Sequence, residues 1–197
     1  MNNNETSPRR DFMKKSLTGT IALSAGLTLG STLLGTLTAN AGSTDYVAPD
    51  SPIAANEKEF RMGVIGPAEL SLATSQIAVN KATDKFVKQF ANFELTEAIA
   101  VTGVLKDLNT PVPAMTAKAK ATLATIKNTP AGPEFDKAFI KAQLENHEFL
   151  RDLAQNYISK GKLPGAAENQ GRHLATLSLA VFKEHVAITS GILTELK

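Results

Sequence analysis

This chain of 197 residues contains no cysteine and no tryptophan, and it has only two tyrosines and three histidines. Without cysteine the protein has no disulfide bond, no thiolate metal site, no covalent haem attachment and no redox-active thiol pair. The sequence also lacks a Gly-x-Ser-x-Gly elbow and a glycine-rich phosphate loop, which argues against a serine hydrolase and a nucleotide-binding enzyme. Stability therefore depends on packing alone.

A strongly basic surface is also missing once the N-terminal segment is set aside. The whole chain has a formal charge of +2, but removing residues 1–41 leaves 17 basic and 17 acidic residues. A formally neutral domain has no excess of basic side chains for binding nucleic acid. We therefore expect no nucleic-acid partner.

The N-terminal segment has the organisation of an export signal. Arg9 and Arg10 are followed by Phe12 and Lys14, and no side chain from residue 16 to residue 44 is charged. Adjacent arginines before such a run are typical of bacterial twin-arginine signals. We expect the twin-arginine translocase to be a partner during export, and the protein to be periplasmic or exported.

A small-x-small cleavage site at Ala39 and Ala41 ends this signal, so we expect a signal peptide over residues 1–41. If it is not cleaved, the uncharged run is about long enough to span a bilayer once and would anchor the protein in the inner membrane. Residues 42–56 are rich in Pro, Ser and Asp and predict a flexible leader. Residues 57–197 form the predicted domain.

Apolar residues in this domain recur at intervals of three and four, and few aromatics accompany abundant Ala, Leu, Lys and Glu. The pattern predicts four long helices and, in the connection 109–133, a short helix. The expected ranges are 57–82, 84–108, 115–126 for the short helix, 134–160, and 166 to the C-terminus. Asp84 is the expected N-cap of the second long helix, and Gly66-Pro67 should kink or restart the first. We expect an all-α, antiparallel four-helix bundle.

Polar residues interrupt the middle of each apolar stripe. Glu97 lies between Phe93 and Val101 in the second stripe, and every other long helix has an ionisable residue on or beside its buried face. The candidates for a mid-bundle metal site are Glu69, Glu97, His147, Glu184 and His185. Because carboxylates are rarely buried without a compensating partner, a metal ion or a hydrogen-bond network should accompany them.

The number of residues between each candidate and the nearest turn predicts which candidates lie at the same depth in the bundle. Glu69 and Glu97 each lie about 14 residues from a turn near residue 83, roughly 20 Å at the helical rise, so we expect them to face one another. For His147 and His185 the same estimate gives a mismatch of roughly 9 Å.

The chain has no Glu-x-x-His pair of the kind found in di-iron bundles. One hypothesis is that the polar residues bind iron, manganese or zinc. Another is that they form a buried hydrogen-bond network that fixes helix register in place of a lost metal site. A third is that they face solvent.

The sequence resembles the bacterial domain-of-unknown-function 4142 family over about residues 57–196. The resemblance rests on Ala68-Glu69, Phe90-Ala91 before Glu97, Gly132-Pro133-Glu134-Phe135-Asp136-Lys137-Ala138-Phe139 leading to Gln143 and His147, and Glu184-His185. It implies an exported protein with a ferritin-like four-helix fold and no established activity. Family members commonly place Asp-His where this chain has Glu97-Ala98, so one histidine is missing.

We expect the chain to be an exported helical-bundle protein of the cell envelope, non-enzymatic, acting through binding or stress protection, and with no cofactor. The alternative is a metal-dependent oxidoreductase or a metal-storage protein that uses the mid-bundle cluster. The sequence identifies no protein partner. It indicates membrane contact only through an uncleaved signal.

Overall fold

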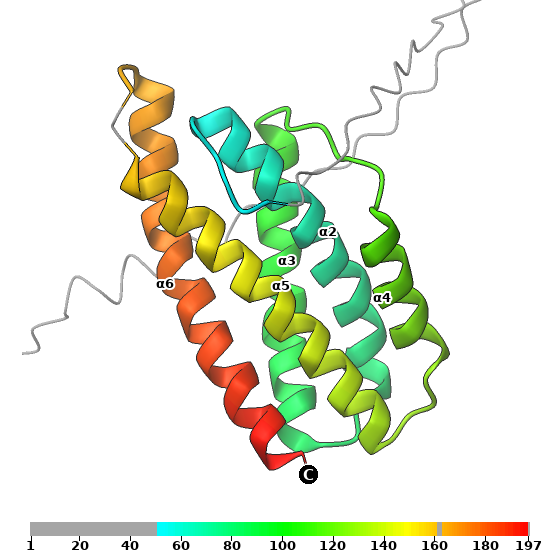
Figure 1. Cartoon of the computed structure of the whole chain (residues 1–197). Coiled ribbons are helices and arrows are strands. Elements are labelled where there is room, and N and C mark those ends of the chain that lie inside the picture. The colour runs from blue at the N-terminus through cyan, green and yellow to red at the C-terminus, as the bar shows by residue number, and fades with distance from the viewer. Residues whose placement is uncertain (1–50, 161–162, 197) are drawn as a thin grey trace, which may run out of the picture. The chain divides into compact units, whose positions relative to one another are not determined.

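The computed structural model describes residues 51–160 and 163–196, and this part of the chain contains five α-helices and no strand. The helices are α2 (Glu57–Lys81), α3 (Lys85–Asp107), α4 (Ala117–Asn128), α5 (Pro133–Ser159) and α6 (Ala166–Glu195). The long helices α2, α3, α5 and α6 form a bundle, and the short α4 packs against α2 and α5 (Figure 1). The all-α prediction is confirmed.

The predicted signal, with Arg9, Arg10, Ala39 and Ala41, lies outside the described residues. Within them, no helix has a stretch apolar enough over a sufficient length to cross a bilayer. The end of the predicted leader, residues 51–56, contacts the helical domain. Ala54 is buried against the core, and the Asn56 side chain accepts a hydrogen bond from the Glu59 amide as the N-cap of α2. Apolar burial and capping attach this segment to the domain.

Local signals account for the helix ends. The Asp84 carboxylate accepts hydrogen bonds from the amides of Phe86 and Val87, which confirms it as the N-cap of α3. Helix α5 begins with Pro133 at its first position, where a missing N–H costs nothing. The predicted restart at Pro67 does not occur, because α2 continues through it as one helix.

Contacts at the two ends of the bundle define the directions of α2, α3 and α5. At one end, Arg61 in the first turns of α2 donates to the carbonyl of Leu108, just after α3 ends. At the other end, the turn between α2 and α3 contacts the start of α5, where Thr83 donates to Asp136. Therefore α3 and α5 run in one direction and α2 in the other. The segment containing α4 returns the chain between them (Figure 1).

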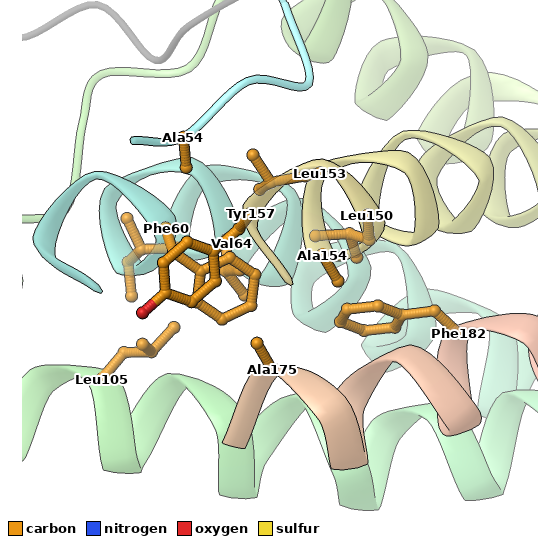
Figure 2. Close-up of a cluster of buried hydrophobic side chains, with 11 residues drawn as sticks. Ala54, Phe60, Val64, Leu105, Leu150, Leu153, Ala154, Tyr157, Ala175 and Phe182 are labelled. Atoms are coloured by element: carbon orange, nitrogen blue, oxygen red, sulfur yellow. The ribbon is translucent and has the colours of Figure 1, made fainter. Parts of the chain in front are cut away.

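The core consists of two hydrophobic clusters with a polar layer between them. The first lies where α2 begins and α5 ends, and in it the rings of Phe60 and Tyr157 stack at 5.0 Å (Figure 2). The second lies toward the opposite end and includes Phe90, Phe135 and Phe139. Between the clusters, all four long helices contribute buried polar side chains. These include Ser71, Thr74, Glu94, Gln143, His147 and His185.

The buried face of α3 differs from the predicted one. Phe93 and Val101, expected inside as part of the second stripe, are exposed. The buried residues of α3 are Val87, Phe90, Ala91, Glu94, Ala98, Thr102 and Leu105. Both faces of α3 carry apolar residues at helical spacing, so periodicity alone does not select one. The buried face of α3 includes small residues such as Ala91 and Ala98, and α3 packs against α2, whose buried residues are also mostly small. Small side chains allow two helices to approach closely.

Candidate metal centre

Three ionisable side chains meet in the polar layer and form what we call the Glu–His–His cluster: Glu94 from α3, His147 from α5 and His185 from α6. All three residues are buried, with exposed fractions of 3%, 3% and 6%. The burial of Glu94 and His185 follows from the helical repeat, because Glu94 lies one turn beyond Phe90, and His185 lies three residues beyond the buried Phe182.

The three side chains present one atom each to a common point. Glu94 Oε2 lies 3.3 Å from His147 Nε2 and 3.1 Å from His185 Nδ1. The two imidazole nitrogens are themselves 3.1 Å apart. Among the described residues, Glu94 Oε2 has no donor in hydrogen-bonding geometry, although it is fully buried. The arrangement is therefore a nearly equilateral triangle of potential ligand atoms.

Hydrogen bonds at the outer nitrogens determine what the inner nitrogens present. His147 Nδ1 lies 2.8 Å from the carbonyl oxygen of Gln143, which can only accept, so Nδ1 is the donor. His185 Nε2 lies 3.1 Å from a carboxylate oxygen of Glu97, and an acceptor this close favours a proton on that nitrogen. In the neutral form, each ring then directs a lone pair from its other nitrogen toward Glu94. Such outer partners are typical of metal-binding histidines.

The three atoms can be held together by a metal ion or by a proton, and His185 Nδ1 is a position for such a proton. Burial alone disfavours a charged imidazole, but the contacts with Glu94 and Glu97 outweigh it and raise the pKa of His185 to about 9. Burial also works against the charged carboxylate, yet the contacts with His147 and His185 hold the pKa of Glu94 well below its usual range. The cluster thus attracts positive charge, from a proton or from a metal cation.

Aromatic rings cover the cluster. The Phe90 ring meets the His185 ring edge to face at 5.2 Å, and the Phe182 ring lies 6.2 Å from the His147 ring. These rings restrict water around the ligand atoms and restrain the orientation of the imidazoles, as the apolar shell of a metal site does.

A second polar group lies on the α2 side of the same layer, and we call it the amide–hydroxyl group: Ser71, Thr74, Gln143 and Asn146. The Gln143 amide accepts from Ser71 at 3.0 Å and donates to Thr74 at 2.9 Å. Asn146 donates to Ser71 at 2.9 Å and to the Pro67 carbonyl at 3.0 Å. The side chains of this group hydrogen-bond with one another and with the backbone.

A cleft of about 330 Å³ between α3 and α6 leads to the cluster. The buried Glu94 and His147 line its inner end, Glu97 also lines it, and apolar residues such as Val101, Val181 and Phe182 form much of the rest. Ligand atoms that are buried in the core are therefore reachable from one side.

The structure brings two of the five predicted metal ligands together, namely His147 and His185. Glu97 contacts His185 from outside the triangle, and its side chain is 45% exposed. Glu69 pairs with Lys106 at 2.6 Å instead of facing Glu97, and Glu184 is exposed. Sequence reasoning missed Glu94, although its spacing of four from Phe90 and from Ala98 was an available signal.

The predicted mismatch in depth between His147 and His185 is also wrong, since their rings lie 4.7 Å apart. The estimate assumed that α6 begins level with the end of α5. Instead, Arg172 donates to the carbonyls of Ile158 and Lys160, so the first turns of α6 extend past the end of α5. His147 lies 13 residues before Lys160, and His185 lies 13 residues after Arg172. The stagger places both at one depth.

The geometry of the triangle is compatible with a metal site. Ligands at about 2.0–2.2 Å from one metal ion, with right or tetrahedral angles between them, are about 2.8–3.6 Å apart. The three measured separations fall in this range. Two imidazoles and one carboxylate form the set that binds non-haem iron(II) in oxygenases and zinc in several hydrolases. The cluster can therefore hold a single divalent metal ion.

Asp136, in the Gly-x-x-Phe-Asp segment, has a structural role. This residue is buried, and its carboxylate accepts hydrogen bonds from the Thr83 amide, the Thr83 hydroxyl and the Asp84 amide at 2.6–3.0 Å. It joins the start of α5 to the turn between α2 and α3, and thereby sets the depth of His147 relative to Glu94.

Comparison with curated proteins and with solved structures finds no match. The sequence model of one protein family, described as a domain of unknown function (DUF4142), matches residues 44–188. This match covers more than half of the chain and includes Glu94, His147 and His185, as well as Asp136. The chain therefore belongs to the DUF4142 family.

Proposed function

We propose that this protein binds one divalent first-row transition metal ion through Glu94, His147 and His185. The observation that carries the proposal is the convergence of three potential ligand atoms at 3.1–3.3 Å, with an oxygen acceptor within 3.1 Å of the outer nitrogen of each imidazole. Atoms that only accept repel one another unless a cation lies between them. A divalent ion supplies that charge.

The cleft supports a site with open coordination positions. A structural zinc site fills all four positions with protein ligands, whereas catalytic sites keep at least one position for water or substrate. Here the described residues bring three ligands, and the cleft lies beside two of them. This favours a metal that meets an exchangeable ligand over a metal that only joins helices.

A second candidate function is purely structural. In it, a proton on His185 takes the place of the metal, and the cluster fixes helix register as a buried network. The raised pKa of His185, to about 9, favours this candidate because the imidazolium pairs with both Glu94 and Glu97. The two candidates differ in whether a metal ion displaces that proton at neutral pH.

Metal analysis separates the two candidates. Protein purified through its native route should contain close to one iron, manganese or zinc ion per chain. After metal removal, added metal at about 100 times its dissociation constant should raise the free energy of unfolding by about 2.7 kcal/mol. Glu94→Gln should abolish both effects, and Glu69→Gln should preserve them because Glu69 pairs with Lys106 outside the cluster. Wild-type protein that has no metal and gains no stability would establish the structural candidate.

A ferritin-like topology and an exported location complete the proposal. The single long crossing between α3 and α5 supports the first, because ferritin-like bundles have one such connection. The Arg9-Arg10 pair before an uncharged run supports the second. Replacing both arginines with lysine should leave the protein in the cytoplasm, as measured by cell fractionation. Export of the double variant at the wild-type level would contradict twin-arginine transport.

A further inference from the structure

The cleft between α3 and α6 has walls of a different chemistry from its inner end. At the inner end lie Glu94 and His147, two of the proposed metal ligands. The walls are mostly aliphatic and aromatic and include Val101, Leu177 and Val181. A pocket with a polar end and apolar walls fits a molecule with one polar head and an apolar tail.

Leucines at the mouth of the cleft are unusually open to water. Leu177 is 66% exposed and Leu174 is 37% exposed, and both line the cleft on the α6 side. Val101 faces them from α3 and is also partly exposed. Large apolar side chains gathered at the rim of a concave site are typical of a surface that an apolar ligand covers.

The net charge of the proposed metal site limits which polar head group a ligand can have. A divalent ion held by Glu94 keeps one net positive charge, which one monoanionic head neutralises. Among the described residues that line the cleft, none is lysine or arginine. Phosphate or a second carboxylate would therefore lack a partner. Glu97 is hydrogen-bonded to His185 and half exposed, so water screens its charge.

We propose that this cleft binds an aliphatic monocarboxylate, with its carboxylate on the metal ion and its chain along the apolar walls. The inference rests on the proposed metal site and names the class of ligand that the site takes. A volume of about 330 Å³ places the cleft at the small end of small-molecule sites and suits a chain of medium length.

Cobalt(II)-loaded protein tests the inference, because the visible spectrum of cobalt reports a new ligand. Octanoate should change this spectrum and bind at least tenfold more tightly than acetate, since only octanoate buries a chain. Val181→Ser should weaken octanoate at least threefold and leave acetate and cobalt binding unchanged. Ile188→Ser is the matched control on α6, because Ile188 is exposed and does not line the cleft. If Val181→Ser folds poorly, Leu177→Ser at the mouth of the cleft replaces it.

The outcomes separate this inference from the metal proposal. Failure of cobalt to bind wild-type protein would overturn both. Cobalt binding with equal affinities for octanoate and acetate would overturn only the ligand class, and so would equal weakening by Val181→Ser and Ile188→Ser. Unchanged octanoate binding to metal-free Glu94→Gln protein would show that the metal does not hold the head of the ligand.

Discussion

The amide–hydroxyl group and the Glu–His–His cluster lie in one layer of the bundle but differ in how their buried polar atoms are paired. In the amide–hydroxyl group, the hydrogen bonds of Ser71 and Gln143 close within the protein. In the cluster, three atoms approach one another and Glu94 Oε2 receives no hydrogen bond among the described residues. Amides and hydroxyls both donate and accept, so they can satisfy one another. A carboxylate and two neutral imidazoles that donate outward can only accept where they meet, so a proton or a metal ion must lie between them.

His147 connects the two regions. Its Nδ1 donates to the backbone carbonyl of Gln143, and the side chain of the same glutamine belongs to the amide–hydroxyl group. The amide–hydroxyl group therefore helps to hold the imidazole of His147 in place. Side-chain substitutions in the amide–hydroxyl group should then change stability, whereas substitutions around the cluster should change what it binds.

The largest expected effect on stability is at Gln143. Gln143→Met keeps a similar size but removes the hydrogen bonds with Ser71 and Thr74, and we expect a loss of about 2–3 kcal/mol in the free energy of unfolding. The stoichiometry of bound metal should not change, because the backbone carbonyl that orients His147 remains. Urea unfolding and metal analysis measure the two results. Gln155→Met, on the exposed side of α5, is the control. Equal stability of the two variants would mean that the amide–hydroxyl group contributes nothing.

Much of this fold follows from local signals. Asp84, Pro133 and the glycines after residue 160 mark helix ends within a few residues of where they lie. The sequence does not show that Glu94 rather than Glu97 is the buried ligand, because apolar residues flank both glutamates in α3. That choice depends on which face meets α2. The meeting of His147 and His185 depends on the stagger that Arg172 sets, and this contact joins residues on two helices.

Glu97 offers a smaller and more selective test. Glu97→Ala removes the acceptor that orients His185, and loss of such an outer partner typically weakens metal binding 10–100-fold. Unfolding of the metal-free protein should change by less than about 1 kcal/mol, because the side chain is half exposed. Calorimetric titration with zinc measures the first effect. Glu184→Ala is the control, since Glu184 adjoins His185 in the chain but is exposed. Equal zinc affinity of the two variants would show that Glu97 does not position His185.

The smallest expected effect is the dependence of metal-free stability on pH. His185 has a pKa of about 9 in the folded protein, above its ordinary value of 6.5. The folded state therefore holds this proton more tightly than the unfolded state. Its contribution is complete below pH 6.5 and is lost as pH rises through 9. Each unit of pKa difference is worth about 1.4 kcal/mol, and screening at Glu97 reduces the total, so we expect a loss of about 1–2 kcal/mol.

Thermal unfolding of metal-free protein between pH 6 and pH 10 measures this loss. His185→Gln should flatten the curve, whereas His173→Gln should preserve it because His173 is exposed. Metal-loaded protein should show the opposite trend over the same interval, since a metal ion must displace the proton and binds more tightly as pH rises. The amide–hydroxyl group has no titrating side chain. We therefore attribute the opposite pH trends of metal-free and metal-loaded protein to the cluster. Parallel curves for metal-loaded and metal-free protein would mean that no proton leaves the cluster when metal binds.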